Sequence, residues 1–260
     1  MVRLLEDADV EVLGRLADAS NLALLVRVGG TQGALAIYKP VRGERPLWDF
    51  PEGTLAAREV AAYAISAAGG WGVVPETVLR DGPQGPGSLQ RWVGDPEVEP
   101  QYPVDVVPPD AIPDGWLPVL HGEDGEGRPV VVVHEDSDAV RAVAAFDAVI
   151  NNSDRKGSHL VREDDGLRGF DHGVSLHEDA KLRTVLWGFA GQPLPAVEVD
   201  RITRVLTALD DGTSDLRSQL DGLITAAEVA ALGTRCRSLL RRATYPRPSG
   251  QWPAIPWPPL

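Results

Sequence analysis

The sequence is short of several residue types, and each shortage excludes something. It has a single cysteine, Cys236, so it can form neither an intrachain disulfide nor a cluster of cysteine ligands around a metal. No stretch approaches the roughly 20 consecutive apolar residues that a membrane-spanning helix needs. Residues 1–12 carry acidic groups early and lack an apolar core, so they do not resemble a signal peptide. We therefore expect a cytoplasmic protein without a transmembrane segment.

Basic charge is also scarce. The 25 lysines and arginines face 38 aspartates and glutamates, which gives a net charge of −13. Nucleic acids and anionic membrane surfaces both attract a basic face, so we expect no nucleic-acid partner and no membrane association. Only Lys39, Lys156 and Lys181 are lysines. Each of these three positions is therefore a candidate for a specific role.

The length and the apolar content of the chain suit a globular fold. Its 260 residues, 43% of them apolar, are enough for one large domain or two lobes. Alternating apolar residues bounded by turn signals predict strands in the first third. These are residues 10–14, 21–28, 34–41, 73–79 and 88–93. A helical pattern with Thr54 as its cap predicts a helix over residues 54–70 among them.

The rest of the chain is more helical. Residues 94–114 are rich in proline and aspartate and predict a linker or an irregular insertion. After them we expect a hairpin over residues 116–135 and helices over 137–151, 197–211 and 225–243, followed by a proline-rich tail. The sequence thus predicts an α+β fold in two lobes. Residues 1–93 would form an N-lobe with an antiparallel sheet and one helix, and residues 94–260 a mainly helical C-lobe.

The stretch INNSDRKGSHLV (150–161) places acidic, basic and histidine side chains together between apolar flanks. Phosphoryl transfer from ATP needs a lysine on the phosphates, a carboxylate holding that lysine, a base near the acceptor and ligands for metal ions. In protein kinases the base and a metal-binding asparagine are five residues apart. Asp154 and His159 have this spacing, and Asp171 follows on a turn of the form D-x-G.

Two upstream residues complete the set. Lys39 lies on a predicted strand and Glu59 on the predicted helix that follows it. Each of these residues alone also fits a structural role, such as a surface lysine, a solvated glutamate, an ion-paired turn or a packed histidine. Their order along the chain, which is lysine, glutamate, D-x-x-x-x-H and then D-x-G, indicates a phosphotransfer site.

These motifs make the chain resemble the phosphatidylinositol 3/4-kinase superfamily. It looks closest to type II phosphatidylinositol 4-kinases and most like an actinobacterial branch, with HipA-like protein kinases as more distant relatives. The matching stretches are IYKPVRGE (37–44), REVAAYAISAAGGWGVVPETVL (58–79), GSLQRWV (87–93) and FDAVINNSDRKGSHLV (146–161). In the last of them the family pattern D-x-x-x-x-N-x-D-R-x-x-x-N appears as Asp147, Asn152, Asp154, Arg155 and His159.

The resemblance implies a two-lobed protein-kinase-like fold with ATP between the lobes. Ser20 and Asn21 would close the phosphate-binding loop. Lys39 would contact the α- and β-phosphates, and Glu59 would orient Lys39. A hinge would offer backbone N–H and C=O groups to adenine, and its residues would be Gln90, Arg91, Trp92 and Val93.

The resemblance also implies the catalytic roles. Asp154 would be the base, and Lys156 would neutralise the transferring phosphate or an anionic acceptor. Asp171 and His159 would bind Mg²⁺ or Mn²⁺. His159 departs from the family, which usually has asparagine there, and an imidazole suits Mn²⁺ better than the harder Mg²⁺.

The expected function is therefore an ATP-dependent kinase. Its acceptor would be a hydroxyl of a soluble polyol, a lipid headgroup or a protein. Two alternatives stay open at this point. One is a catalytically weak or inactive nucleotide-binding pseudokinase or scaffold, which the histidine at position 159 would favour. The other is transfer of AMP rather than phosphate on the same fold.

Overall fold

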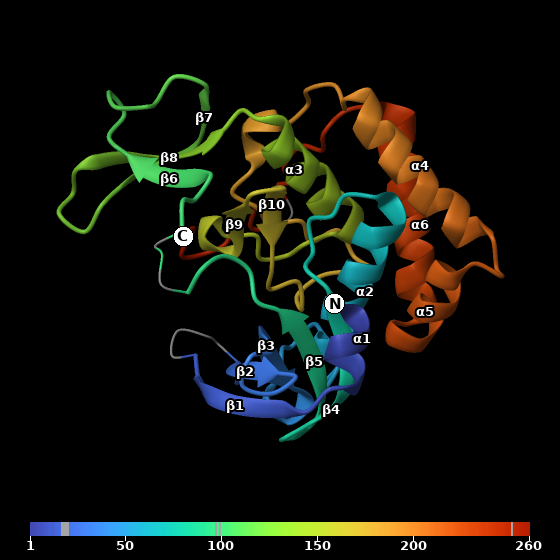
Figure 1. The fold of residues 1–260 in the computed structure, drawn as a ribbon. Helices are drawn as coiled ribbons and strands as arrows, with labels where there is room; N and C mark the ends of the chain where they lie inside the picture. Colours follow the sequence, from blue (N-terminus) through green and yellow to red (C-terminus); the bar gives the residue numbers. More distant parts are fainter. Residues whose placement is uncertain (17–20, 97, 99, 251) are drawn as a thin grey trace.

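A computed structural model describes residues 1–16, 21–96, 98, 100–250 and 252–260 and shows two parts (Figure 1). The first part, at the bottom of Figure 1, is built on an antiparallel sheet. Within the described residues its strand order is β1–β2–β3–β5–β4. The strands are β1 (Val10–Arg15), β2 (Leu24–Val28), β3 (Ala34–Pro40), β4 (Thr77–Gly82) and β5 (Gly85–Arg91). Strand β3, which carries Lys39, is thus central in the sheet.

The sheet has an apolar face because β2 and β3 bury every second residue. Val26, Val28 and Leu89 are fully buried there, together with Leu5 of the short helix α1 (Val2–Asp7). Burying each such side chain contributes about 1.5–3 kcal/mol. This packing fixes the position of β3 against its neighbours.

Helix α2 (Leu55–Gly69) connects the sheet to the second part. It ends at Gly70, which has the left-handed φ of 74° that glycine adopts without cost. The helix packs on β4 and β5 and also on helices of the second part. Its buried Arg58 pairs with Glu228 at 2.5 Å, across 170 positions of sequence. The two parts are therefore held together by a buried ion pair as well as by apolar packing.

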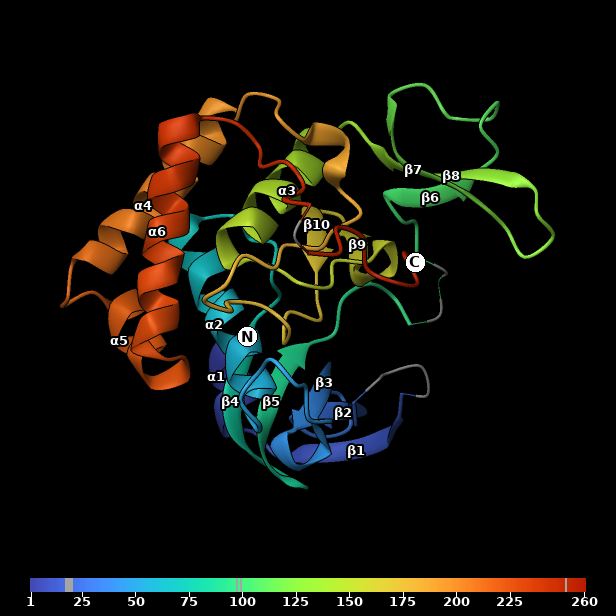
Figure 2. The same ribbon diagram turned by 180° about the vertical axis from the view of Figure 1, so that it is seen from behind.

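The second part contains two small sheets and a group of helices. The strands are β6 (Val104–Val107), β7 (Trp116–Glu123) and β8 (Pro129–Glu135) in the order β6–β8–β7, and the pair β9 (Leu160–Glu163) and β10 (Gly166–Gly169). The helices are α3 (Asp138–Ile150), α4 (Ala196–Asp210), α5 (Asp215–Leu223) and α6 (Ala226–Arg242), with 3₁₀ turns η2 (Gly157–His159) and η3 (Trp187–Phe189); a further 3₁₀ turn, η1 (Val41–Gly43), follows β3 in the first part. The β6–β8 sheet and the α4–α6 helices lie on opposite sides of α3 (Figures 1 and 2). Helix α3 is the centre of the core, since Val143, Phe146 and Val149 have no exposed surface.

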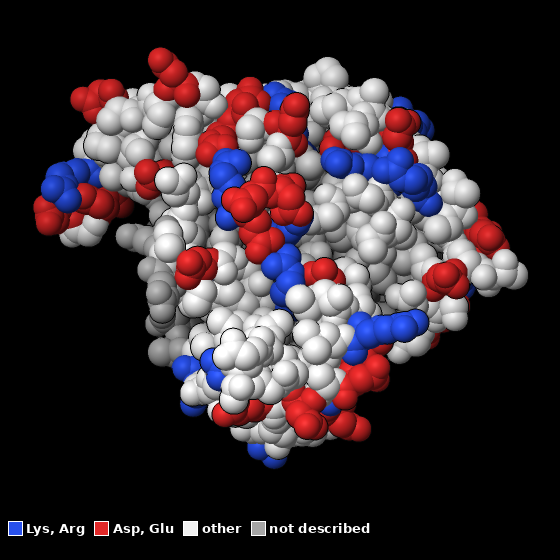
Figure 3. Space-filling model, in the orientation of Figure 1, with Lys and Arg blue, Asp and Glu red and all other residues white. Residues whose placement is uncertain are grey.

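The surface carries charges of both signs. On the face drawn in Figure 3, lysine and arginine side chains are interspersed with aspartate and glutamate and form no broad basic area. Among the helices of the described residues, none has the length and the apolar character required to cross a membrane.

The structure differs from the sequence-based expectation at several elements. The strand predicted over residues 73–79 begins only at Thr77, because the N–H groups of Val73 and Val74 donate to Ser66 Oγ instead of joining the sheet. The predicted irregular segment 94–114 contains β6, which pairs with β8. Helices α1 and α5 were not predicted. Because of α1, the sheet of the first part is accompanied by two helices, α1 and α2, rather than the one expected. Both unpredicted helices are short, and short helices have weak periodicity.

His134 on β8 provides a pH test of how the β6–β8 sheet is attached. Its Nε2 accepts the Gly188 N–H at 3.1 Å, and burial lowers the pKa of His134 below its ordinary value of 6.5. Below about pH 6.5 the unfolded chain binds a proton that the folded chain resists, so the free energy of unfolding falls as the pH falls. We expect the melting temperature to drop between pH 7 and pH 5, and His134→Gln to reduce that drop.

The matched control for His134 is His121→Gln, because His121 is exposed on the neighbouring strand β7. The control variant should keep the full pH dependence of the wild type. If His134→Gln also keeps it, protonation of His134 does not destabilise the fold.

Candidate active site

A cleft lies between the two parts and collects most of the predicted site residues. One hollow of about 380 Å³ is lined by Lys39, Glu59, His159 and Asp171 among others, and a second of about 820 Å³ lies beside residues 91–96 and 100–102. The two hollows share Leu16, Ile37, Gln90, Ser158 and Phe170. They therefore form one continuous cleft with a charged end and a more apolar end.

Lys39 stands at the charged end between two carboxylates. Its Nζ lies 2.5 Å from Glu59 Oε1 and 2.9 Å from Asp171 Oδ1, which is the ion pairing expected from the sequence. Burial by itself lowers the pKa of Lys39, but the two carboxylates outweigh burial and raise that pKa above its ordinary value. In return, Lys39 holds the pKa of Asp171 well below its usual range. Both partners are thus charged at neutral pH.

Asp171 occupies a constrained backbone position. Its φ is 60°, a left-handed value that few non-glycine residues adopt and that is often found at functional sites. The next residue, His172, donates its backbone N–H to Glu59 Oε2 at 2.9 Å. Glu59 therefore contacts Lys39 through one oxygen and the turn of Asp171 through the other.

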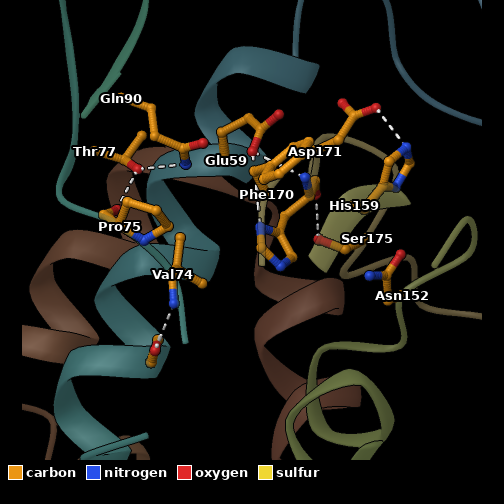
Figure 4. Close-up of polar contacts among 12 residues, drawn as sticks. Glu59, Val74, Pro75, Thr77, Gln90, Asn152, His159, Phe170, Asp171 and Ser175 are labelled. Atoms are coloured by element: carbon orange, nitrogen blue, oxygen red, sulfur yellow. Dashed lines mark hydrogen bonds and ion pairs between the residues drawn. The ribbon is translucent and has the colours of Figure 1, made fainter. Parts of the chain in front are cut away.

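His159 and Asp171 both come from the second part, and their side chains point toward one another in the cleft (Figure 4). Its Nε2 lies 3.5 Å from Asp171 Oδ2. Burial lowers the pKa of His159 to about 4, so the imidazole is neutral at pH 7 and can donate a lone pair to a metal. Two donors about 2.1 Å from a shared ion stand roughly 3 Å apart, so this pair fits one divalent cation. In the part of the chain that the structure describes, no three His, Cys, Asp or Glu side chains converge, so further ligands would come from nucleotide or water.

Asp154 lies near His159 and Asp171, but its carboxylate faces the ammonium group of Lys156. Its Oδ2 is 3.5 Å from Lys156 Nζ, and its backbone N–H donates to Asn152 Oδ1 at 3.0 Å. Burial raises the pKa of the Asp154 carboxyl above its ordinary value, although Lys156 lowers it in part. A carboxylate in this state accepts a proton more readily than an exposed one, which suits a general base.

A buried arginine organises this loop, and the sequence analysis gave it no role. Arg155 donates to both carboxylate oxygens of Asp147, at 2.8 and 2.9 Å, and Asp147 also accepts from Asn152 Nδ2 at 2.9 Å. The same guanidinium reaches Phe170 O at 3.2 Å and His172 Nε2 at 2.7 Å. The signal was present in the pattern D-x-x-x-x-N-x-D-R, where these residues occupy fixed spacings.

Most residues of the predicted hinge are hydrogen-bonded within the protein. Gln90 Nε2 donates to Thr77 Oγ1 at 2.8 Å (Figure 4). The backbone N–H groups of Arg91 and Trp92 donate to the carbonyls of Glu76 and Leu35, at 2.9 and 3.0 Å. They are therefore not available to adenine as the structure stands. Val93, the last residue of the predicted hinge, also lines the cleft.

The predicted phosphate-binding loop is only partly described. Ser20 lies outside the described residues. Asn21 lines the charged end of the cleft, and its Oδ1 accepts the Arg45 N–H at 2.8 Å. Glu44, to which the sequence analysis gave no role, also lines the cleft. Its carboxylate accepts hydrogen bonds from the N–H groups of Leu55 and Ala56, so the N-terminus of α2 is already capped.

Comparison with solved structures identifies the fold. The chain superposes on hydra Fam20 with sugar at a TM-score of 0.57 and 13% identity, over 93% of this chain and 86% of that chain. It superposes on the Golgi casein kinase with Mn/ADP bound at a TM-score of 0.58 and 12% identity, over 93% of this chain and 74% of that chain. The predicted two-lobed kinase-like α+β fold is thereby confirmed.

Sequence similarity then gives the family. The chain is 46% identical over 265 residues to protein Rv2133c of Mycobacterium tuberculosis, covering 98% of this chain and 93% of that protein. It belongs to the same family as Rv2133c. No protein-family model matches the chain.

The Asp147–Arg155 pair gives a stability prediction. Arg155→Met leaves the Asp147 charge buried without its partner, and breaking a buried pair in this way costs about 3–5 kcal/mol. We expect a loss of that size in the free energy of unfolding measured by urea denaturation. The control is Arg217→Met, because Arg217 pairs with Asp221 on the exposed surface of α5. That variant should lose less than about 1 kcal/mol, and similar losses in both variants would contradict the prediction.

Proposed function

We propose that the chain is an ATP-dependent kinase of the phosphatidylinositol 3/4-kinase-like superfamily, with an alcohol group as its acceptor. The observation that carries this proposal is Lys39, held in the cleft by Glu59 and Asp171 together. ATP-dependent phosphotransfer needs a fixed cation on the phosphates and an acidic metal ligand beside it. Asp154, a carboxylate with a raised pKa near the same cleft, supplies the group that such a reaction needs for its acceptor.

The proposed roles follow the geometry. Lys39 contacts the α- and β-phosphates, and Glu59 orients it. Adenine lies at the apolar end of the cleft beside Val93, between Ile37 of the first part and Phe170 of the second. The lobes divide at residues 1–93 and 94–260.

The proposed cofactor is ATP with Mg²⁺ or Mn²⁺. The donor set fits a divalent cation, since Asp171 is ionised, His159 is neutral, and the two face each other. The related Golgi casein kinase structure with Mn/ADP bound supports the combination of nucleotide and divalent cation on this fold. The metal would neutralise charge on the phosphates, while the protein orients the acceptor and accepts its proton.

The reaction itself is tested with ATP labelled separately at the α- and γ-phosphates, in the presence of Mg²⁺ or Mn²⁺ and hydroxyl acceptors. We expect label to reach the acceptor from the γ-position alone. Transfer of the α-label would identify an AMP transferase instead. Nucleotide binding without transfer of either label would identify a pseudokinase.

Asp154 should affect transfer and not binding. Asp154→Asn removes the proton acceptor and keeps a side chain of the same size. We expect the rate of γ-phosphate transfer to fall by about 10²–10⁴-fold, because this is the usual contribution of general base catalysis. The affinity for ATP, measured by calorimetry, should stay within a factor of about two. Equal rates in the variant and the wild type would exclude Asp154 as the base.

His159 should set the metal preference. An imidazole and a carboxylate form a donor set of borderline softness, so we expect Mn²⁺ to support transfer at least as well as Mg²⁺. His159→Asn replaces the nitrogen donor by an oxygen and should shift the preference toward Mg²⁺. The measurement is the ratio of transfer rates in the two metals for each protein. An unchanged ratio would show that His159 is a packed histidine and does not bind the metal.

A further inference from the structure

Two cations lie beside the proposed base. Lys156 Nζ is 3.5 Å from Asp154 Oδ2. Arg183 is far away in sequence, but its backbone is bonded to both sides of Asp154. Its N–H donates to Asn152 O, and its carbonyl accepts the Arg155 N–H, each at 3.0 Å. Since residues 152 and 155 bracket Asp154, the Arg183 side chain starts next to the base, and its charge offsets in part the rise in the pKa of Asp154 that burial causes.

The Arg183 guanidinium has unused donors. Its Nε is buried without a hydrogen-bond partner, and its Nη2 makes one long contact of 3.4 Å to Ile255 O. No carboxylate in the described part of the chain forms an ion pair with it, although the chain carries a net charge of −13. Buried polar groups without a partner are rare, and a bound anion or a water molecule is what ordinarily satisfies a group of this kind.

Lys181, two residues away, shows the contrasting case. Its Nζ pairs with Asp49 Oδ2 at 2.7 Å and lies 5.0 Å from the ring centroid of Trp48 and 5.0 Å from that of Trp252. The side chain is almost completely buried. Its charge is therefore used within the protein. Around this loop Arg183 has no carboxylate partner among the described residues, and Lys156 has the 3.5 Å contact to Asp154.

We propose that the acceptor carries an anionic group, a phosphate or a carboxylate, near the hydroxyl that is phosphorylated, and that Arg183 and Lys156 bind this group. The inference depends on the proposed kinase function. A guanidinium presents parallel donors that match two oxygens of a phosphate or carboxylate, and the ammonium adds a second charge. In the reaction the acceptor oxygen bonds to the γ-phosphorus, the bond to the β-phosphate oxygen breaks, ADP leaves, and the hydroxyl proton passes to Asp154.

The surroundings of the two cations favour a small soluble acceptor. The Lys156 side chain is only 19% exposed. Residues of the tail border the site, because Pro259 O accepts the Gly157 N–H at 2.8 Å and Ile255 O contacts Arg183. A membrane lipid would need a broad basic area around the site, and the acidic chain does not favour one. We therefore assign the acceptor to small hydroxylated anions.

The test uses a neutral polyol, two soluble anions derived from it and one lipid that carries it as a headgroup. Glycerol, glycerate, glycerol 3-phosphate and vesicles of phosphatidylglycerol share one skeleton, and inorganic phosphate tests the anion alone. Binding is measured by calorimetry on protein saturated with a non-hydrolysable ATP analogue, so that the triphosphate positions are filled. We expect phosphate and at least one of the two soluble glycerol anions to bind, and glycerol to bind at least about 10-fold more weakly.

Matched variants identify the residue responsible. Arg183→Gln should weaken binding of the anions by about 10-fold or more and leave the affinity for the ATP analogue unchanged. Arg183→Lys keeps the charge and should recover part of the loss. The control is Arg128→Gln, in the exposed segment between β7 and β8, which should behave as the wild type.

The outcomes separate this inference from the proposed function. If the ATP analogue binds but glycerol binds as well as its anions, or if Arg183→Gln and Arg128→Gln behave alike, the anionic acceptor is wrong and the kinase stands. Preference for phosphatidylglycerol vesicles over the soluble anions would overturn the assignment to a small acceptor. If the ATP analogue does not bind, or no label leaves the γ-position, the kinase proposal fails and the acceptor inference fails with it.

Discussion

The buried pair of Asp147 and Arg155 determines the geometry of the candidate active site. Two charges without exposed surface are costly to remove from water, and they are tolerated only when hydrogen bonds satisfy the remaining donors and acceptors. Here the guanidinium donates to Asp147, to Phe170 O and to His172. It thereby joins the end of α3, the loop of Asp154 and the turn of Asp171. The relative positions of Asp154, His159 and Asp171 are set by a network that no substrate has to contact.

The constraint extends across the cleft through His172 and Glu59. His172 contacts Arg155 through its ring and Glu59 through its backbone N–H. Glu59 in turn holds Lys39 of the sheet, and the neighbouring Arg58 binds Glu228 of α6. A chain of buried polar contacts therefore runs from the core of the second part to the central strand of the first. This continuity explains why Asp171 can be held at a φ of 60°, since the contacts on both sides fix the turn.

The sequence predicted what depends on local spacing and missed what depends on pairing. Strand β3, helix α2 and helix α3 were expected at nearly their observed positions, because their periodicity is strong. The ion pairing of Lys39 followed from the order of elements. The engagement of Arg91 and Trp92 did not, because it depends on which carbonyls the sheet register brings opposite them. Arg183 had no local signal at all, since its position beside Asp154 comes from backbone bonds to residues about 30 positions earlier.

The distribution of lysines connects composition with this geometry. The chain has 22 arginines and only three lysines, and two of the lysines, Lys39 and Lys156, pair with carboxylates of the candidate site. An ammonium is a compact point charge that fits between two carboxylates, as Lys39 does, or among aromatic rings, as Lys181 does. A planar guanidinium instead suits a position that must hold several acceptors in one plane, as Arg155 does with Asp147. The same reasoning separates the two cations beside Asp154: Lys156 supplies charge at one point, and Arg183 supplies directed donors that remain for a bound anion.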